Sequence, residues 1–423
     1  MLDRTKAPKT HQINSLELPK PDIFYLDNGI PVYVTNLGTQ EVVRMEMVFY
    51  AGRPYEQKRL SARSTASLLK EGSLLYSADH IAEEIDYWGC SLGTPFNLDT
   101  ANITLHSLRK HFGKVLPIVA DLLKNPAFPK HELKAFIKRN QQSLKVDLTK
   151  NDVIAYRKIT EFIFGEDHPY GYNSYPETYA NVTHDQVLEH FHTFYKSNNC
   201  AIFLSGRIEQ QEIDLLNLYI GQTLSTGDIP FQPLAKPSST PQKVRIKRPD
   251  SIQTAVRIGR HLFNRSHEDY TGMYVLNTIL GGYFGSRLMA NIREDKGYTY
   301  NIYSTLDPMA MDGYFYIGTE VSPEFLDNTL IEIYREVDLI QNKLVEEEEL
   351  EMVKNYLLGN FLSMLDGPFN VSEVVKTIVT ERLDFPFFNK LVKTVQDITA
   401  EDLQKLAQKY LNTEDMWEVV VGC

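Results

Sequence analysis

Histidines and carboxylates with metal-ligand spacing are the first residues in this chain that could do chemistry. His80, Glu83 and Glu84 form an H-x-x-E-E sequence, and ligands three and four residues apart would share one helix face. This five-residue motif lacks the second histidine of a zinc site, so we interpret it as a solvated helix face. His190 and His192 lie two residues apart, which places them on different faces of a helix, so we do not expect them to chelate a metal together.

The segment 280–304 contains the second group of chemically interesting residues, Arg293 and Tyr300. Its glycines do not match a phosphate loop, because no G-K-S or G-K-T follows them and the G-x-G-x-x-G spacing is absent. We expect Ser286 to cap a short helix that carries Arg293, and Gly297 to end that helix in a left-handed turn. Tyr300 then falls at the start of the following strand.

Two stretches of the chain, 181–206 and 397–422, follow the same pattern without a gap. Each begins with a β-branched residue and a threonine, Val182-Thr183 and Ile398-Thr399, and the threonine can N-cap a helix. Each ends in an apolar strand closed by glycine. The pattern predicts one domain used twice.

Strands and amphipathic helices are mixed within each half. The pattern predicts a strand at 42–50 and helices at 78–88 and 344–358, and the sequence Asp27-Asn28-Gly29 predicts a tight turn in a hairpin. We attribute the acidic run from Glu346 to Glu349 to the helix dipole, which favours carboxylates at the start of a helix. The expected fold class is α+β, with two homologous α/β sandwich domains, each a largely antiparallel sheet packed with helices.

A proline-rich segment separates the two halves. Five prolines between residues 230 and 249, together with Ser238-Ser239-Thr240, resist helix and sheet and favour an extended linker. We therefore expect an N-terminal domain over 1–220, a linker over 221–245 and a C-terminal domain over 246–423.

Composition and charge narrow the class of protein. The chain has 423 residues, 43% of them hydrophobic and 23% charged, which is typical of globular domains. Its net charge of -11 disfavours nucleic acid as a partner, because phosphate binding needs clustered Lys and Arg. A basic or unfolded peptide fits that charge better. The three cysteines, Cys90, Cys200 and Cys423, have neither disulfide-framework nor zinc-site spacing.

The amino terminus lacks the apolar core of a signal peptide, and no apolar run is long enough to span a membrane. We therefore expect no membrane span and a cytoplasmic location, with the periplasm as the alternative if a signal peptide was removed.

The stretch from Ala51 to Leu108 resembles the opening of the pitrilysin-like metallopeptidases, the family of insulysin and the mitochondrial processing peptidase. The resemblance rests on a strand that ends in Gly52-Arg53, a helix that runs into Glu71-Gly72-Ser73, and a second helix followed by a polar strand. It extends from about residue 24 to residue 422. It implies a small two-domain, bacterial-type subunit.

Active members of that family carry an H-x-x-E-H motif on the first helix, where the histidines bind zinc and the glutamate activates water. Here the motif positions fall on Arg63, Ala66 and Ser67, none of which can do this work. The distal glutamate ligand should lie within 141–145, QQSLK, which contains no carboxylate. The resemblance therefore implies that this chain binds no cofactor, and that zinc belongs to a partner subunit.

Residues 293–300 preserve the family sequence R-E-x-K-G-x-x-Y. The resemblance implies that Arg293 and Tyr300 are site residues, the phenol stabilising the oxyanion of a tetrahedral intermediate and the guanidinium orienting the peptide backbone. The implied function is the non-zinc-binding subunit of a heterodimeric zinc metalloendopeptidase, inactive alone. Its partners would be a homologous H-x-x-E-H-bearing catalytic subunit and a peptide or unfolded polypeptide substrate. The alternative is a catalytically inert structural or peptide-clamping subunit, similar to the core subunits of the cytochrome bc1 complex.

Overall fold

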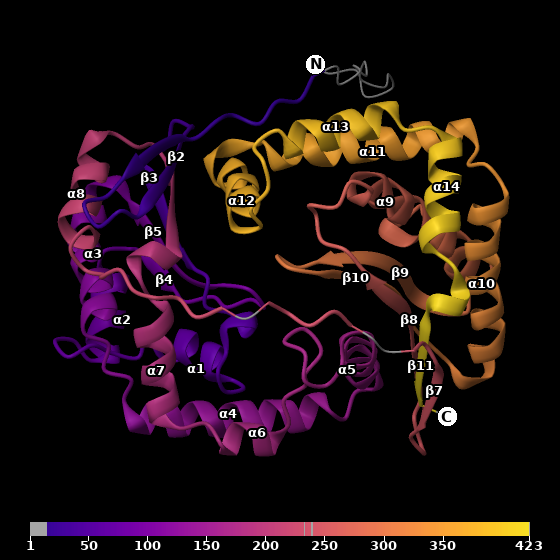
Figure 1. Ribbon diagram of the computed structural model, residues 1–423, viewed down its shortest axis with the longest axis horizontal. Coiled ribbons are helices and arrows are strands. Elements are labelled where there is room, and N and C mark those ends of the chain that lie inside the picture. Colours follow the sequence, from indigo (N-terminus) through magenta and orange to yellow (C-terminus); the bar gives the residue numbers. More distant parts are fainter. Residues whose placement is uncertain (1–14, 232, 238–239, 423) are drawn as a thin grey trace, which may run out of the picture.

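Two β-sheets stand at opposite sides of the molecule, and helices connect and surround them (Figure 1). The structure is a computed structural model that describes residues 15–231, 233–237 and 240–422. No helix in these ranges is long and apolar enough to cross a membrane. Cys90 and Cys200 carry free thiols, and Cys423 lies outside the described residues.

The first sheet has the strand order β1-β2-β6-β3-β5-β4. All its neighbours are antiparallel except β2 and β6, which are parallel. The expected hairpin is confirmed: β1 pairs with β2, and Gly29 takes a left-handed φ of 83° in the turn. The strands are β1 Asp22–Tyr25, β2 Pro31–Asn36, β3 Val42–Phe49, β4 Ser91–Gly93, β5 Ala101–Leu108 and β6 Cys200–Gly206.

The second sheet has the order β7-β11-β8-β10-β9. It again contains one parallel pair, β7 with β11, among antiparallel neighbours. The expected α+β fold, with two largely antiparallel sheets packed by helices, is therefore confirmed. The strands are β7 Lys243–Lys247, β8 Thr254–Leu262, β9 Thr299–Pro308, β10 Gly313–Val321 and β11 Trp417–Gly422.

The helices follow the same division into halves. In the first half they are α1 Ser61–Leu68, α2 Ala78–Tyr87, α3 Arg109–Lys124, α4 Lys130–Asp147, α5 Asn151–Phe164, α6 Pro176–Ala180, α7 His184–Phe194 and α8 Gln210–Ile220. In the second half they are α9 Tyr270–Asn277, α10 Leu326–Asn342, α11 Glu347–Met364, α12 Gly367–Thr380, α13 Phe387–Asp397 and α14 Ala400–Tyr410. Short 3-10 turns are η1 Arg53–Tyr55, η2 Ser197–Asn199, η5 Pro323–Phe325 and η6 Thr413–Asp415, and π-helical turns are η3 Thr278–Gly282 and η4 Met289–Asp295.

The repeated sequence pattern corresponds to repeated structure. The Thr183 hydroxyl accepts from the Gln186 amide at the start of α7, and the Thr399 hydroxyl accepts from the Asp402 amide at the start of α14. The strand that follows each helix, β6 or β11, lies inside its own sheet. The same local signals therefore build a helix and an inner strand in both halves.

Each half lends one helix to the sheet of the other half. Helix α12 packs on β2 and β6 of the first sheet, and helix α5 packs on β8 and β11 of the second. The side chains of Val371 and Val375 on α12 share a core cluster with Val48 and Phe203 of the first sheet. Ion pairs accompany both contacts. On α12, Glu373 pairs with Arg44 at 2.8 Å and Lys376 pairs with Glu46 at 3.0 Å, and on α5, Asp152 pairs with Arg257 of β8.

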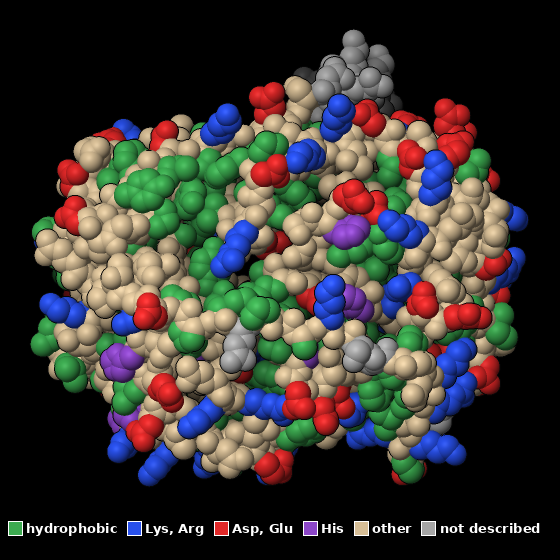
Figure 2. Space-filling view, viewed as in Figure 1, with side chains coloured by type: hydrophobic (Ala, Val, Ile, Leu, Met, Phe, Trp, Pro, Cys, Tyr) green, Lys and Arg blue, Asp and Glu red, His purple; other side chains and the backbone are tan. Residues whose placement is uncertain are grey.

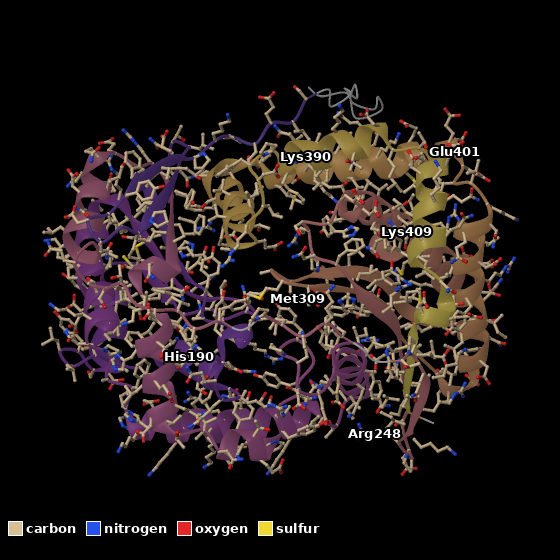
Figure 3. The ribbon with its side chains drawn as sticks, viewed as in Figure 1. His190, Arg248, Met309, Lys390, Glu401 and Lys409 are labelled. Atoms are coloured by element: carbon tan, nitrogen blue, oxygen red, sulfur yellow. The ribbon has the colours of Figure 1, made fainter. Side chains whose placement is uncertain are left out.

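Two more contacts join the halves. The backbone amide of Ala310, at the tip of the β9–β10 hairpin, donates to the Asp99 carboxylate of the first half at 3.0 Å. Figure 3 places the neighbouring Met309 between the two sheets. Arg248 donates to the carbonyl oxygens of Leu148 and Thr149 at 3.2 Å.

The described residues between α8 and β7 form neither helix nor strand, and they cross between the halves (Figure 1). β7 begins at Lys243 and pairs in parallel with β11, so the last residues of the expected linker already belong to the second sheet. On the face that Figure 2 shows, acidic and basic side chains are interspersed.

Candidate functional site

Helix α1 carries the three positions where the family motif would stand. Ala66 is buried at 1% exposure, so its side chain belongs to the core. The Arg63 guanidinium donates to Asn140 Oδ1 of α4 at 3.1 Å. A cation therefore links the two helices that would carry zinc ligands.

The residues at this position do not fit zinc. Segment 141–145 lies on α4, where Gln141 donates its amide to the carbonyl oxygen of Pro176. Within the described ranges, no group of three or more His, Cys, Asp or Glu side chains could hold a metal ion. Zinc needs neutral or anionic donors, and Arg63 is neither.

The histidines considered as metal ligands, His80, His190 and His192, make contacts typical of structural residues. His80 stacks on Tyr76, and Glu84 accepts from the indole of Trp88, in agreement with a helix face rather than a ligand set. His190 is buried while His192 is exposed, so the prediction that they lie on different faces of α7 is confirmed.

His190 holds the start of α1 (Figure 3). Its Nε2 donates to the carbonyl oxygen of Ala51 at 3.0 Å, which leaves Nδ1 as the acceptor for the hydroxyl of Ser61 at 3.3 Å. Burial lowers the pKa of this imidazole to about 4. The neutral form is therefore part of the folded structure.

We expect His190 to make the folded state weaker in acid. The unfolded imidazole takes up a proton near pH 6.5, about 2.5 units above the folded pKa, so stability falls as the pH drops from about 6.5 to about 4. Between about pH 7 and about pH 5 the loss from this one group is about 2 kcal/mol. Denaturant titrations at the two pH values should show a smaller pH dependence for His190→Gln than for the unchanged chain. The exposed His192→Gln variant should keep the full dependence, and equal slopes for all three proteins would contradict the assignment.

The structure brings Arg293 and Tyr300 together. The Arg293 guanidinium lies 5.1 Å from the ring centre of Tyr300 and 4.7 Å from the ring centre of Phe284. Tyr300 is 84% exposed. No ion pair or hydrogen bond from the described residues engages the Arg293 side chain or the Tyr300 hydroxyl. Both polar groups are therefore available to a ligand, and the two rings hold the cation by cation–π attraction.

A π-helical turn positions Arg293. In η4 the Lys296 amide donates to the carbonyl oxygen of Asn291, five residues earlier, at 3.0 Å. Gly297 then takes a φ of 66° and ends the helix, as expected, and Tyr300 is the second residue of β9. π-helical turns are often found at functional sites.

Ser286 does not cap this helix, so that expectation is wrong. Its hydroxyl is buried without a hydrogen-bond partner. The helix is held from outside instead: Arg287 makes two hydrogen bonds to Glu349 of α11, at 2.8 and 2.6 Å. Asn291 donates to Glu332 and Glu336 of α10. Glu349 thus does more than complement the dipole of α11, which begins at Glu347 rather than at residue 344.

Phe284 is the site residue that the sequence interpretation missed. It lies in the glycine-rich turn before η4 and is 61% exposed. Gly281 lets this turn approach β9 closely, because a Cβ there would lie 2.4 Å from the Ser304 amide nitrogen. The available signal in the sequence was an aromatic residue between Gly282 and Gly285.

A family model matches the middle of the chain. Residues 181–357 match the model described as the peptidase M16 inactive domain. The chain is also 23% identical over 344 residues to "Uncharacterized zinc protease YmxG" of Bacillus subtilis, covering 80% of this chain and 83% of that protein. The chain therefore resembles the M16, or pitrilysin-like, peptidase family over residues 181–357. Arg63, Ala66 and Ser67 stand at the motif positions, so the H-x-x-E-H sequence is absent there.

Solved structures of other proteins share the fold. A peptidase M16 inactive domain from Pseudomonas fluorescens superposes with a TM-score of 0.85 at 22% identity, covering 95% of this chain and 98% of that one. A chain of Complex III2 from Candida albicans superposes with a TM-score of 0.75 at 15% identity, covering 95% of both chains. At these identities the likeness establishes the fold alone.

Proposed function

We propose that this protein is the zinc-free subunit of a two-subunit metalloendopeptidase and that it supplies Arg293 and Tyr300 to a substrate held by its partner. The observation that carries the proposal is the aromatic–guanidinium group formed by Phe284, Arg293 and Tyr300. The Arg293 guanidinium and the Tyr300 hydroxyl make no hydrogen bond to a described residue. The helical turn that carries Arg293 is held by hydrogen bonds to α10 and α11.

The chemistry suits acyl transfer. When water attacks a peptide carbonyl, the oxygen becomes an oxyanion, and the exposed Tyr300 hydroxyl is free to donate a hydrogen bond to it. The planar guanidinium of Arg293 can donate to neighbouring carbonyl oxygens of the peptide. Metal and water activation are assigned to a homologous partner with an intact H-x-x-E-H helix.

The test is reconstitution. The purified chain alone is expected to hydrolyse no peptide and to copurify with less than stoichiometric zinc. Addition of the H-x-x-E-H subunit from the same source is expected to give zinc-dependent hydrolysis that neither chain shows separately. Zinc-dependent cleavage by this chain alone, with contaminating peptidase removed, would contradict the proposal.

A structural subunit is the second candidate. It is supported by the similarity in fold to a chain of Complex III2. A structural subunit has no use for the uncommitted Arg293 and Tyr300, which is why we place it second. The division into domains at 221–245 and the cytoplasmic location remain proposals alongside the function.

A further inference from the structure

A polar pocket of about 670 Å³ lies where the family's metal site would be. Its walls are the end of α1, the loop after α1, the strands β4 and β5, and the helix α4. Three cations line it: Arg63 on α1, Lys70 after α1 and Arg139 on α4. Glu71 is the one acidic side chain among the described lining residues.

The three cations are not neutralised by the protein. None of them forms an ion pair with a described residue. Arg63 makes a hydrogen bond to the neutral Asn140 and lies 5.9 Å from the ring centre of Tyr179. Arg139 is exposed and makes no side-chain hydrogen bond to a described residue. The cations within such a cluster repel one another, and a bound anion would relieve that repulsion.

The other titratable group facing the pocket adds no negative charge. His106 lines the pocket from β5. Burial, and next the nearby Arg44, lower its pKa, which leaves it neutral near pH 7. The pocket therefore has an excess of positive charge in a protein whose net charge is -11. Nonspecific attraction to the whole chain would therefore not account for an anion bound here.

The pocket also borders an open sheet edge. β4 is the last strand of the first sheet, pairing only with β5 among the described strands, and Ser91 and Gly93 of β4 line the pocket. An edge strand presents unpaired backbone donors and acceptors to an extended chain. The unpaired backbone groups of β4 and the three cationic side chains therefore border the same pocket.

We propose that this pocket binds a carboxylate of an extended peptide segment, with Arg63 and Arg139 as the anion-binding residues and β4 as the backbone template. Guanidinium groups match the two oxygens of a carboxylate. The proposal does not depend on Arg293, Tyr300 or a catalytic partner. It also restricts the ligand: the overall acidity of the chain favours basic peptides, whereas this pocket selects an acidic group.

Calorimetric titration of the full-length chain with short capped peptides tests the proposal. A peptide with central glutamates is expected to bind more tightly than the same peptide with glutamines, and salt is expected to weaken that binding. A neutral peptide with a free C-terminus, compared with its amidated form, shows whether a terminal carboxylate also serves. Binding of either carboxylate form alone supports the proposal and identifies its source.

Variants locate the binding. Arg139→Gln is expected to weaken the glutamate peptide about tenfold, because a charge-assisted hydrogen bond is lost, and to leave the glutamine peptide unchanged. Lys134→Gln removes the same charge from the same helix outside the pocket and is the matched control. Arg63→Gln should weaken the glutamate peptide in the same way. Because this change also breaks the contact to Asn140, its thermal midpoint should be measured as well.

The proposal fails if neither carboxylate peptide binds more tightly than its matched peptide without the carboxylate, or if Lys134→Gln weakens binding as much as Arg139→Gln.

Discussion

Replacing Tyr300 with phenylalanine is expected to lower the turnover of the assembled peptidase about 10²-fold, because one hydrogen-bond donor to the oxyanion is lost. The change removes only an exposed hydroxyl that has no partner among the described residues. The ring that contacts Arg293 remains. The chain should therefore stay folded and bound to its partner, with kcat lowered and KM little changed.

Arg293 provides a second variant with a different expected result. Arg293→Lys keeps the charge but loses the planar guanidinium, so both kcat and KM should be impaired. Lys296→Ala is the control, since it removes a cation three residues away whose described ion pair is with Asp295. Wild-type turnover in both Tyr300→Phe and Arg293→Lys complexes would instead support the structural subunit.

Asp152→Asn is expected to lower the free energy of unfolding by about 3 kcal/mol, because it leaves the Arg257 guanidinium buried without a counterion. Arg257 is 2% exposed, and its one ion pair within the described part of the chain is with Asp152. Chemical denaturation followed by circular dichroism would measure the loss. Asp147→Asn removes a carboxylate whose described ion pair, with Lys150, is at the surface, and it should change stability little.

A double variant separates a lost ion pair from general damage to α5. Asp152→Asn combined with Arg257→Met removes the unpaired charge and leaves an apolar side chain near the rings of Tyr303 and Tyr316. It should be more stable than Asp152→Asn alone. A double variant that is less stable than the single one would contradict this account of the buried pair.

Local signals explain which parts of the fold the sequence predicted. The threonine caps of α7 and α14, the turn at Gly29 and the left-handed Gly297 each act within a few residues, so they can be seen in the printed sequence. The exchange of α5 and α12 could not be predicted in this way. Both helices have ordinary amphipathic patterns, and only the folded chain decides which sheet receives them.

The same distinction between local and distant signals explains why only part of the site was predicted. Arg293 and Tyr300 were found because the motif around them is continuous in sequence. Phe284 contacts the guanidinium from a turn nine residues earlier along the chain, and the supports from α10 and α11 are more distant still. The pocket cations come from α1, the loop after it and α4. No short motif joins such residues, and their grouping depends on tertiary packing.

The exchanged helix α12 also sets the order in which the protein can be completed. The strands of the first sheet end at Gly206, yet the side chains of Val48 and Phe203 are covered by α12, residues Gly367–Thr380. A ribosome makes the chain from its amino terminus, so this apolar face waits uncovered while more than a third of the protein is still being translated. The nascent first half thus exposes an apolar face until the second half is made, and its packing is complete only when α12 arrives.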